Sequence, residues 1–167
     1  MPVDILDIEK VDTVKSYIRE FILWPDMWKA FSLNLSGFKW QQVKLQRKDK
    51  SKVPTLTGVY SFVIQPQIAN HPYCSYLMYI GQTTDQDLQK RFEQYIDELE
   101  GKRQSRPKVK YLLDKYKDHL FFVYLPLDNK LAPKDVESEL LKAFLPPVND
   151  VDTFPAEVKK VVKAALG

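Results

Sequence analysis

Residues 77–83 read Leu77-Met78-Tyr79-Ile80-Gly81-Gln82-Thr83, and the apolar run at 76–80, which overlaps this stretch, predicts a β-strand. Nineteen residues before Tyr79 lies the tyrosine of Gly58-Val59-Tyr60, which opens a second apolar run at 59–64. A proline-containing loop at 65–75 separates the runs, so we expect the second strand to return antiparallel to the first. The two strands then place Tyr60 and Tyr79 on neighbouring strands.

Downstream of this pair the sequence predicts helices and one more strand. An amphipathic helix begins at Thr84 or Asp85 and runs to about residue 100, because its apolar residues recur every three or four positions. Prolines at 107, 133 and 155 each suit the first turn of a helix. The remaining predicted elements are helices at 108–117 behind Pro107, at 133–144 and from 155, and a strand at 119–125. The expected fold is α+β, with a small three-stranded, mainly antiparallel sheet flanked by helices in the order β-β-α-α-β-α.

Residues 1–52 are predicted to be an N-terminal extension that contacts DNA or forms a dimer interface. Apolar residues at helical spacing in this segment predict one helix before Trp24 and a short one after Pro25, because the proline interrupts the helix. Residues 38–45 alternate in a way that fits a strand or a hairpin arm, and the basic stretch up to Lys52 fits an exposed loop. We therefore divide the chain into this extension, a main domain at 53–150 and a C-terminal helix at 151–167.

Composition is that of an ordinary globular protein. The chain has 167 residues, 44% of them hydrophobic and 28% charged, which suffices for one compact domain. Cys74 is the only cysteine, which excludes an internal disulfide and a thiolate zinc site within one chain and favours a reducing compartment. There is no evident signal peptide, and no apolar run approaches the roughly 18 residues of a membrane span. We expect a cytoplasmic protein that does not contact membranes.

Two basic clusters stand out against a net charge of only +3. Residues 44–52 hold five cations and one acid, Asp49, and residues 102–110 hold five cations and no acid. Such cations contact DNA phosphates without reading sequence, although each cluster alone also fits a solvated surface. The predicted nucleic-acid-binding residues are Lys44, Arg47, Lys48, Lys50 and Lys52 in the first cluster and Lys102, Arg103, Arg106, Lys108 and Lys110 in the second.

Four residues offer the chemistry that hydrolysis of a phosphodiester requires: an activated nucleophile and relief of charge on the phosphate. Tyr60 or Tyr79 can activate water only if nearby positive charge lowers the phenol pKa from about 10. Arg91 offers a permanently charged fork that suits phosphate. Glu137 offers carboxylate oxygens, which Mg²⁺ and Mn²⁺ prefer.

The position of Glu137 on its predicted helix supports this role. At about 100° per residue it lies in the middle of the apolar face formed by Val136, Leu140 and their neighbours. Glu139 lies about 120° from that centre, where a solvated acid belongs. An ionised carboxylate directed at a core is costly unless a cation or a metal pairs with it.

Each residue also has a simpler interpretation. Tyr60 and Tyr79 fit ordinary strand aromatics, and Arg91 fits a surface arginine whose stem covers apolar neighbours. Glu137 fits a buried partner of Arg91 with no metal, and Asn149 fits a turn residue after two prolines. The order and spacing of the whole set favour the catalytic interpretation.

The set closely resembles the GIY-YIG nuclease family. Gly58-Val59-Tyr60 resembles the first motif, with valine in place of the usual isoleucine, and Tyr79-Ile80-Gly81 matches the second. The resemblance spans about residues 57–150. The remaining matching residues are Arg91, Tyr95, Glu137 with Leu140-Leu141, Pro146 and Asn149.

The resemblance implies a DNA endonuclease that uses Mg²⁺ or Mn²⁺, with Glu137 as the single carboxylate ligand. It also implies that Tyr60 and Tyr79 activate the nucleophile, that Arg91 stabilises transition-state charge and that Asn149 braces the site. Many members carry histidine at the position of Tyr95, so which tyrosine is the base stays open. The loop at 65–75 is longer than in the minimal family domain and resembles an insertion.

The length of the chain favours a small restriction-like or phage-type endonuclease acting on duplex DNA. Cutting both strands with one site per chain favours a homodimer, or two sequential nicks. One alternative is a catalytically silent module of the same fold that binds nucleic acid or protein. The other is an unrelated α/β protein-binding domain.

Overall fold

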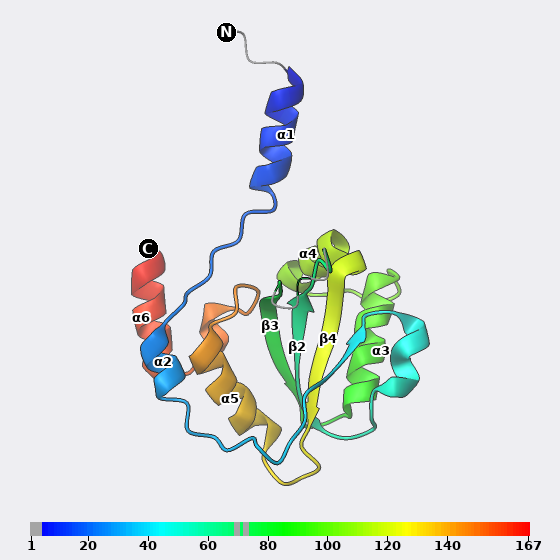
Figure 1. Ribbon diagram of the computed structural model, residues 1–167, viewed down its shortest axis with the longest axis vertical. Helices are drawn as coiled ribbons and strands as arrows, with labels where there is room; N and C mark the ends of the chain where they lie inside the picture. Colours follow the sequence, from blue (N-terminus) through cyan, green and yellow to red (C-terminus); the bar gives the residue numbers. More distant parts are fainter. Residues whose placement is uncertain (1–4, 69–70, 72–73) are drawn as a thin grey trace.

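A four-stranded antiparallel sheet is the centre of the computed structural model, which describes residues 5–68, 71 and 74–167 (Figure 1). The predicted α+β class and the antiparallel sheet flanked by helices are confirmed, but the predicted number of three strands is wrong. The strands are β1 (Gln41–Lys44), β2 (Gly58–Ile64), β3 (Tyr76–Thr83) and β4 (Leu120–Pro126), in the spatial order β1-β4-β2-β3.

The additional strand is β1, which falls within the stretch expected to form a strand or a hairpin arm. It pairs with β4 from Gln41 opposite Tyr124 to Lys44 opposite Phe121. β2 occupies only one edge of β4, so the other edge is free to hydrogen-bond with β1. Pairing at this edge also buries Val43 in the core.

The helices follow the predicted order from residue 58 onward, and two local expectations need correction. Asp87 begins α3 rather than Thr84 or Asp85, because its carboxylate accepts a hydrogen bond from the Lys90 N–H at 2.6 Å. The basic stretch expected as a loop forms a short 3₁₀ helix, η1 (Arg47–Lys52). The other elements are α1 (Ile5–Lys15), α2 (Pro25–Lys29), α3 (Leu88–Leu99), α4 (Pro107–Tyr116), η2 (Lys117–His119), α5 (Pro133–Phe144), η3 (Val151–Thr153) and α6 (Ala156–Leu166).

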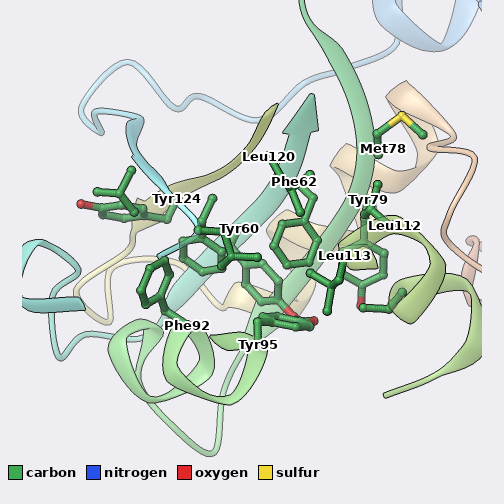
Figure 2. Close-up of a cluster of buried hydrophobic side chains, with 14 of the residues drawn as sticks. Tyr60, Phe62, Met78, Tyr79, Phe92, Tyr95, Leu112, Leu113, Leu120 and Tyr124 are labelled. Carbon is green, nitrogen blue, oxygen red and sulfur yellow. The ribbon is translucent and has the colours of Figure 1, made fainter. Parts of the chain in front are cut away.

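Each face of the sheet carries its own hydrophobic cluster. Tyr60 and Phe62 of β2 point to the face covered by α3 and α4, as Figure 2 shows with residues of those helices. Val59 points to the opposite face, which is covered by α5, α6 and residues 22–38 of the N-terminal segment. Trp24 packs there, so its ring helps to cover the core.

A glycine allows the Tyr60 ring to cross β3. Gly81 lies directly opposite Tyr60 in the strand register. A Cβ atom at Gly81 would come within 2.5 Å of the Tyr60 hydroxyl oxygen and 2.6 Å of its Cζ atom. Gly58 is constrained in the same way, because a Cβ there would collide with the Leu125 carbonyl of β4. Both motif glycines therefore make room for neighbouring atoms.

The outer edge of β3 is closed by the segment that follows α5. The backbone N–H of Val148 donates to the Met78 carbonyl at 2.9 Å. The side-chain amide of Asn149 accepts from the Ile80 N–H at 2.9 Å and donates to the Ile80 carbonyl at 2.8 Å. These bonds satisfy strand groups that an edge otherwise leaves unpaired, and they fix the end of α5 beside β3.

The predicted division at residue 52 stays a prediction, although β1 and η1 on its N-terminal side join the sheet and pack against α3. Within the predicted loop at 65–75, residues 69–70 and 72–73 lie outside the described residues. Across the described part of the chain, the helices are too short or too polar to span a bilayer.

Substitution Gly81→Ala should lower the free energy of unfolding by about 2–3 kcal/mol, because the new methyl group forces the Tyr60 ring out of its place. Urea denaturation measures this loss. Gly37→Ala is the matched control: its Cβ would meet nothing within 4 Å, and it should change stability by less than about 0.5 kcal/mol. Equal effects of the two substitutions would contradict the steric role of Gly81.

Candidate active site

Three predicted site residues form one hydrogen-bonded cluster on the side of the sheet covered by α3. The hydroxyl oxygens of Tyr60 and Tyr95 lie 2.8 Å apart, and each side chain is about 1% exposed. Arg91 donates to both phenols, from Nε to Tyr60 at 3.0 Å and from Nη2 to Tyr95 at 3.1 Å. Arg91 and Tyr95 are four residues apart on α3 and therefore share one face of that helix, which explains why both reach Tyr60.

A pair of glutamines that sequence reasoning missed orients Arg91. The Gln94 Oε1 accepts from Arg91 Nη1 at 2.9 Å, and the Gln94 amide donates to Gln86 Oε1 at 2.7 Å. Gln94 lies three residues after Arg91 on α3, a spacing that brings side chains together. The three-residue spacing could have predicted the contact between Arg91 and Gln94. Glutamine is common on exposed helices, however, so the spacing alone did not single out Gln94.

Burial raises the pKa of Tyr60 and the pKa of Tyr95 above the ordinary phenol value, and the nearby charge of Arg91 only partly opposes the rise. A general base at neutral pH requires a shift in the opposite direction. The two phenols are therefore protonated, and one of their two protons bridges the oxygens. The other proton has no acceptor among the described residues.

Tyr79 belongs to a second pair, which it forms with Arg106. The Arg106 Nη2 donates to the Tyr79 hydroxyl at 2.6 Å, and the guanidinium carbon lies 5.4 Å from the centroid of the Tyr79 ring. The Tyr79 ring also packs against Tyr60, with centroids 6.2 Å apart. The sequence placed Arg106 in the second basic cluster, and its contact with the motif tyrosine Tyr79 was not predicted.

Glu137 is a half-buried carboxylate on α5 without a hydrogen bond or an ion pair to any described residue. Burial raises its pKa to about 7, although the charges of Arg106 and Lys134 oppose the rise. Glu139 differs, because it bonds to the Lys142 ammonium at 2.8 Å. Glu139, expected to be a solvated acid, is also partly buried, so the two acids differ in pairing rather than in exposure. Arg91 is not the partner of Glu137.

The surroundings of Glu137 fit a hard divalent cation that is held weakly by the protein. A partly buried carboxylate with no partner is stabilised in its ionised form by a cation. The described residues contain no group of three or more histidine, cysteine, aspartate or glutamate side chains arranged for a metal. Mg²⁺ commonly uses one or two carboxylates together with water and substrate phosphate, so a single ligand is compatible with it.

A second buried acid, Glu98, also lies near these arginines. Its side chain lies on the same face of α3 as Arg91 and Tyr95, and burial raises its pKa against the opposing charges of Arg91, Arg103 and Arg106. The seven-residue spacing from Arg91 was the available signal, because positions seven apart share a helix face. The structure therefore surrounds Arg106 with acids from two helices.

Asn149 lies beside this site through the backbone of β3. Its amide holds both backbone groups of Ile80, the residue after Tyr79. It thereby fixes the strand that carries Tyr79 and Gly81. The structure brings Tyr60, Tyr95 and Arg91 into direct contact, whereas Asn149 contacts the strand that carries Tyr79 and Glu137 interacts with Arg106 through charge alone.

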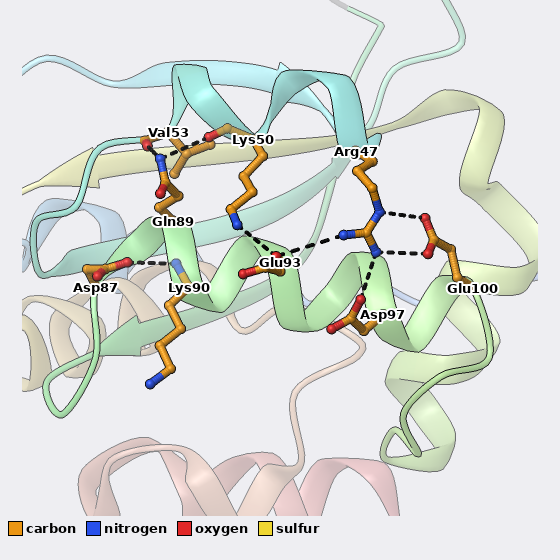
Figure 3. Close-up of polar contacts among 9 residues, drawn as sticks. All are labelled: Arg47, Lys50, Val53, Asp87, Gln89, Lys90, Glu93, Asp97 and Glu100. Atoms are coloured by element: carbon orange, nitrogen blue, oxygen red, sulfur yellow. Dashed lines mark hydrogen bonds and ion pairs between the residues drawn. The ribbon is translucent and has the colours of Figure 1, made fainter.

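Two residues of the first basic cluster, Arg47 and Lys50, pair with acids of α3 and of its C-cap (Figure 3). Arg47 donates to Glu100 at 2.9 and 2.8 Å and to Asp97 at 2.7 Å, and Lys50 bonds to Glu93 at 2.7 Å. Asp97 follows Tyr95 by two residues, which turns it about 200° around the helix. The cluster therefore lies against the side of α3 that faces away from the phenols. Lys52 pairs with Asp49, and Lys44 and Lys48 form no ion pair with the described residues.

The second basic cluster lies between α3 and α4, on the same side as Tyr79. Three of its lysines form exposed ion pairs, which contribute little to stability and can exchange for phosphate. These pairs are Lys102 with Glu100 at 2.6 Å, Lys108 with Asp150 at 2.8 Å and Lys110 with Asp114 at 3.0 Å. Arg103 and Arg106 pair with no acid of the described chain.

No protein-family model matches this chain, and no match was found among curated proteins or solved structures. The case for a function therefore depends on the residues and geometry described above.

Glu137→Gln should stabilise the metal-free protein at pH 8 by about 1–2 kcal/mol, after allowance for the exposed part of the side chain. The raised pKa means that the folded state retains a proton longer than the unfolded chain, so wild-type stability falls as pH rises from about 4.5 to about 7. Glutamine has no such dependence. The gain should therefore vanish below about pH 4.5.

Urea unfolding in EDTA at both pH values measures this effect. Glu139→Gln serves as the control, because it breaks the Lys142 ion pair and should give no gain at pH 8. A gain for Glu137→Gln that is the same at pH 4 and pH 8 would contradict the assigned titration.

Proposed function

We propose that this protein is a divalent-metal-dependent endonuclease of the GIY-YIG type that hydrolyses phosphodiester bonds of DNA. The observation that supports this most is Glu137, a half-buried carboxylate that has no partner among the described residues and interacts with the charge of Arg106. A purely structural site gains nothing from such a group, because an apolar residue of similar size avoids its desolvation cost. A metal-binding site requires it.

The second support is the arrangement of donors around Tyr79. Arg106 bonds to its hydroxyl, and the phenols held by Arg91 lie beside its ring. Fixed N–H and O–H donors of this kind stabilise charge that develops on a phosphate during attack. Gly81 and Asn149 hold the strand that presents Tyr79.

In the proposed reaction, water attacks the phosphorus in line with the leaving oxygen: the P–O bond to water forms, the P–O bond to the leaving oxygen breaks, and the proton that the water loses passes through solvent to the leaving oxygen, while a tyrosine orients the attacking water. Because Tyr60 and Tyr95 are kept protonated, we assign the hydrogen bond from the attacking water to Tyr79. Mg²⁺ or Mn²⁺ on Glu137 would supply Lewis-acid relief of phosphate charge.

We place the duplex along α4 and the second basic cluster, since that cluster adjoins Tyr79 and retains two arginines without acidic partners. Arg47 and Lys50 of the first cluster lie against the side of α3 that faces away from the phenols, so we give that cluster no direct part in holding the scissile strand. Cleavage of both strands by one complex requires two sites, which a homodimer supplies.

Incubation with supercoiled and linear DNA in Mg²⁺, Mn²⁺ or EDTA tests the proposal. Wild type should nick or cut DNA only with metal, and Glu137→Ala should lower the rate by roughly 100-fold or more. Glu139→Ala is the matched control on the same helix and should retain activity within about threefold. Equal loss in both variants would contradict the role of Glu137.

The alternative of a silent nucleic-acid-binding or protein-interaction module makes a different prediction for the same experiment. It expects no cleavage of any DNA or RNA substrate by wild type. A nucleic-acid-binding module adds binding that weakens steeply as salt increases. The partnerless carboxylate Glu137 favours the enzyme.

A further inference from the structure

Arg91 has few donors left for a phosphate. A guanidinium carries five N–H groups. Arg91 commits Nε to Tyr60, Nη1 to Gln94 and Nη2 to Tyr95, so each of its three nitrogens already donates. The side chain is half-buried against these partners. Its geometry is that of a residue that holds two phenols in place.

Arg106 has the opposite character. It makes one hydrogen bond, to Tyr79, so four of its five N–H groups have no acceptor among the described residues. The residue as a whole is solvent-exposed, and its guanidinium is partly buried where it contacts Tyr79. An arginine with several free donors beside a reactive tyrosine is suited to bidentate contact with a phosphate.

The backbone of Arg106 is fixed although its side chain is accessible. Pro107 follows it, which restricts Arg106 to the extended conformation observed, with φ −61° and ψ 141°. Its carbonyl accepts the N–H of Lys110 at 2.8 Å and so begins α4. A side chain that starts from a rigid position loses less entropy when it orders on a ligand.

Acids from two helices lie within electrostatic range of Arg106 without pairing with it. Glu98 on α3 and Glu137 on α5 both respond to its charge, yet neither forms an ion pair with it. The guanidinium bonds to the hydroxyl of Tyr79 instead. Its charge thus stays available to an incoming anion.

We propose that Arg106 binds the scissile phosphate and that Arg91 is a positioning residue that holds Tyr60 and Tyr95. This inference rests on the proposed nuclease function for its catalytic part. It reassigns the contact that the family resemblance gives to Arg91, and it separates Arg106 from the lysines of the second basic cluster, which contact the DNA backbone elsewhere.

Single-turnover cleavage of a labelled DNA duplex in Mg²⁺ is the first arm of the test. Arg106→Gln should lower the cleavage rate roughly 100-fold while changing the Kd for the duplex in EDTA by less than about threefold. Added guanidinium ion should raise the cleavage rate of Arg106→Ala at least about tenfold. The control reaction contains sodium chloride at equal ionic strength. Lys160→Gln on α6 removes one exposed cation and should match wild type.

A rate for Arg106→Gln within about threefold of wild type would overturn the proposal, as would failure of guanidinium to rescue Arg106→Ala. If wild type does not cleave at all, the proposed function fails, and the second arm decides the binding inference by itself.

That arm follows the arginine Nε–Hε signals by NMR while a short DNA duplex is added in EDTA. The Arg106 signal, identified by its loss in Arg106→Gln, should shift, whereas the Arg91 signal should stay in place. A shift of the Arg91 signal without one of Arg106 would overturn the inference, whether or not the protein cleaves DNA.

Discussion

The site depends on the close approach of the Tyr60 ring to the backbone of Gly81. Only a residue without a side chain lets the ring lie over β3 and bring its hydroxyl to Tyr95. Once the two phenol oxygens lie side by side in the core, they need a donor that satisfies both, and Arg91 supplies it from one helical turn before Tyr95. The polar cluster is thus a consequence of strand register and one missing side chain.

Much of this fold follows from local sequence signals. Prolines at 107 and 133 stand at the first positions of α4 and α5, where their fixed geometry suits a helix and their missing N–H costs nothing. The paired tyrosine motifs indicated two neighbouring antiparallel strands, and β2 and β3 pair in that way. β1 was harder to assign to the sheet, because four alternating residues specify a strand without specifying which edge they join.

The hydrogen bonds and charges of the site were harder to predict from the sequence than the fold, for electrostatic reasons. Spacing along α3 indicated that Arg91 and Tyr95 share a face, but it says nothing of how many donors each arginine has left. The cation expected to lower a phenol pKa does not outweigh burial at Tyr60 and Tyr95. Likewise, a count of lysines and arginines gave two similar clusters. Only the contacts separate the one bound to acids of α3 from the one beside Tyr79.

The amide of Asn149 has a consequence for assembly. By occupying both backbone groups of Ile80 it substitutes for a neighbouring strand, so β3 offers no continuous row of free groups to a second chain. Two copies cannot therefore extend their sheets through the strand that carries Tyr79. The opposite edge, β1, is only four residues long and offers a short row at most. Pairing of two copies through their sheets is therefore disfavoured at both edges, and the exposed helices and the N-terminal segment are the remaining surfaces for any such contact.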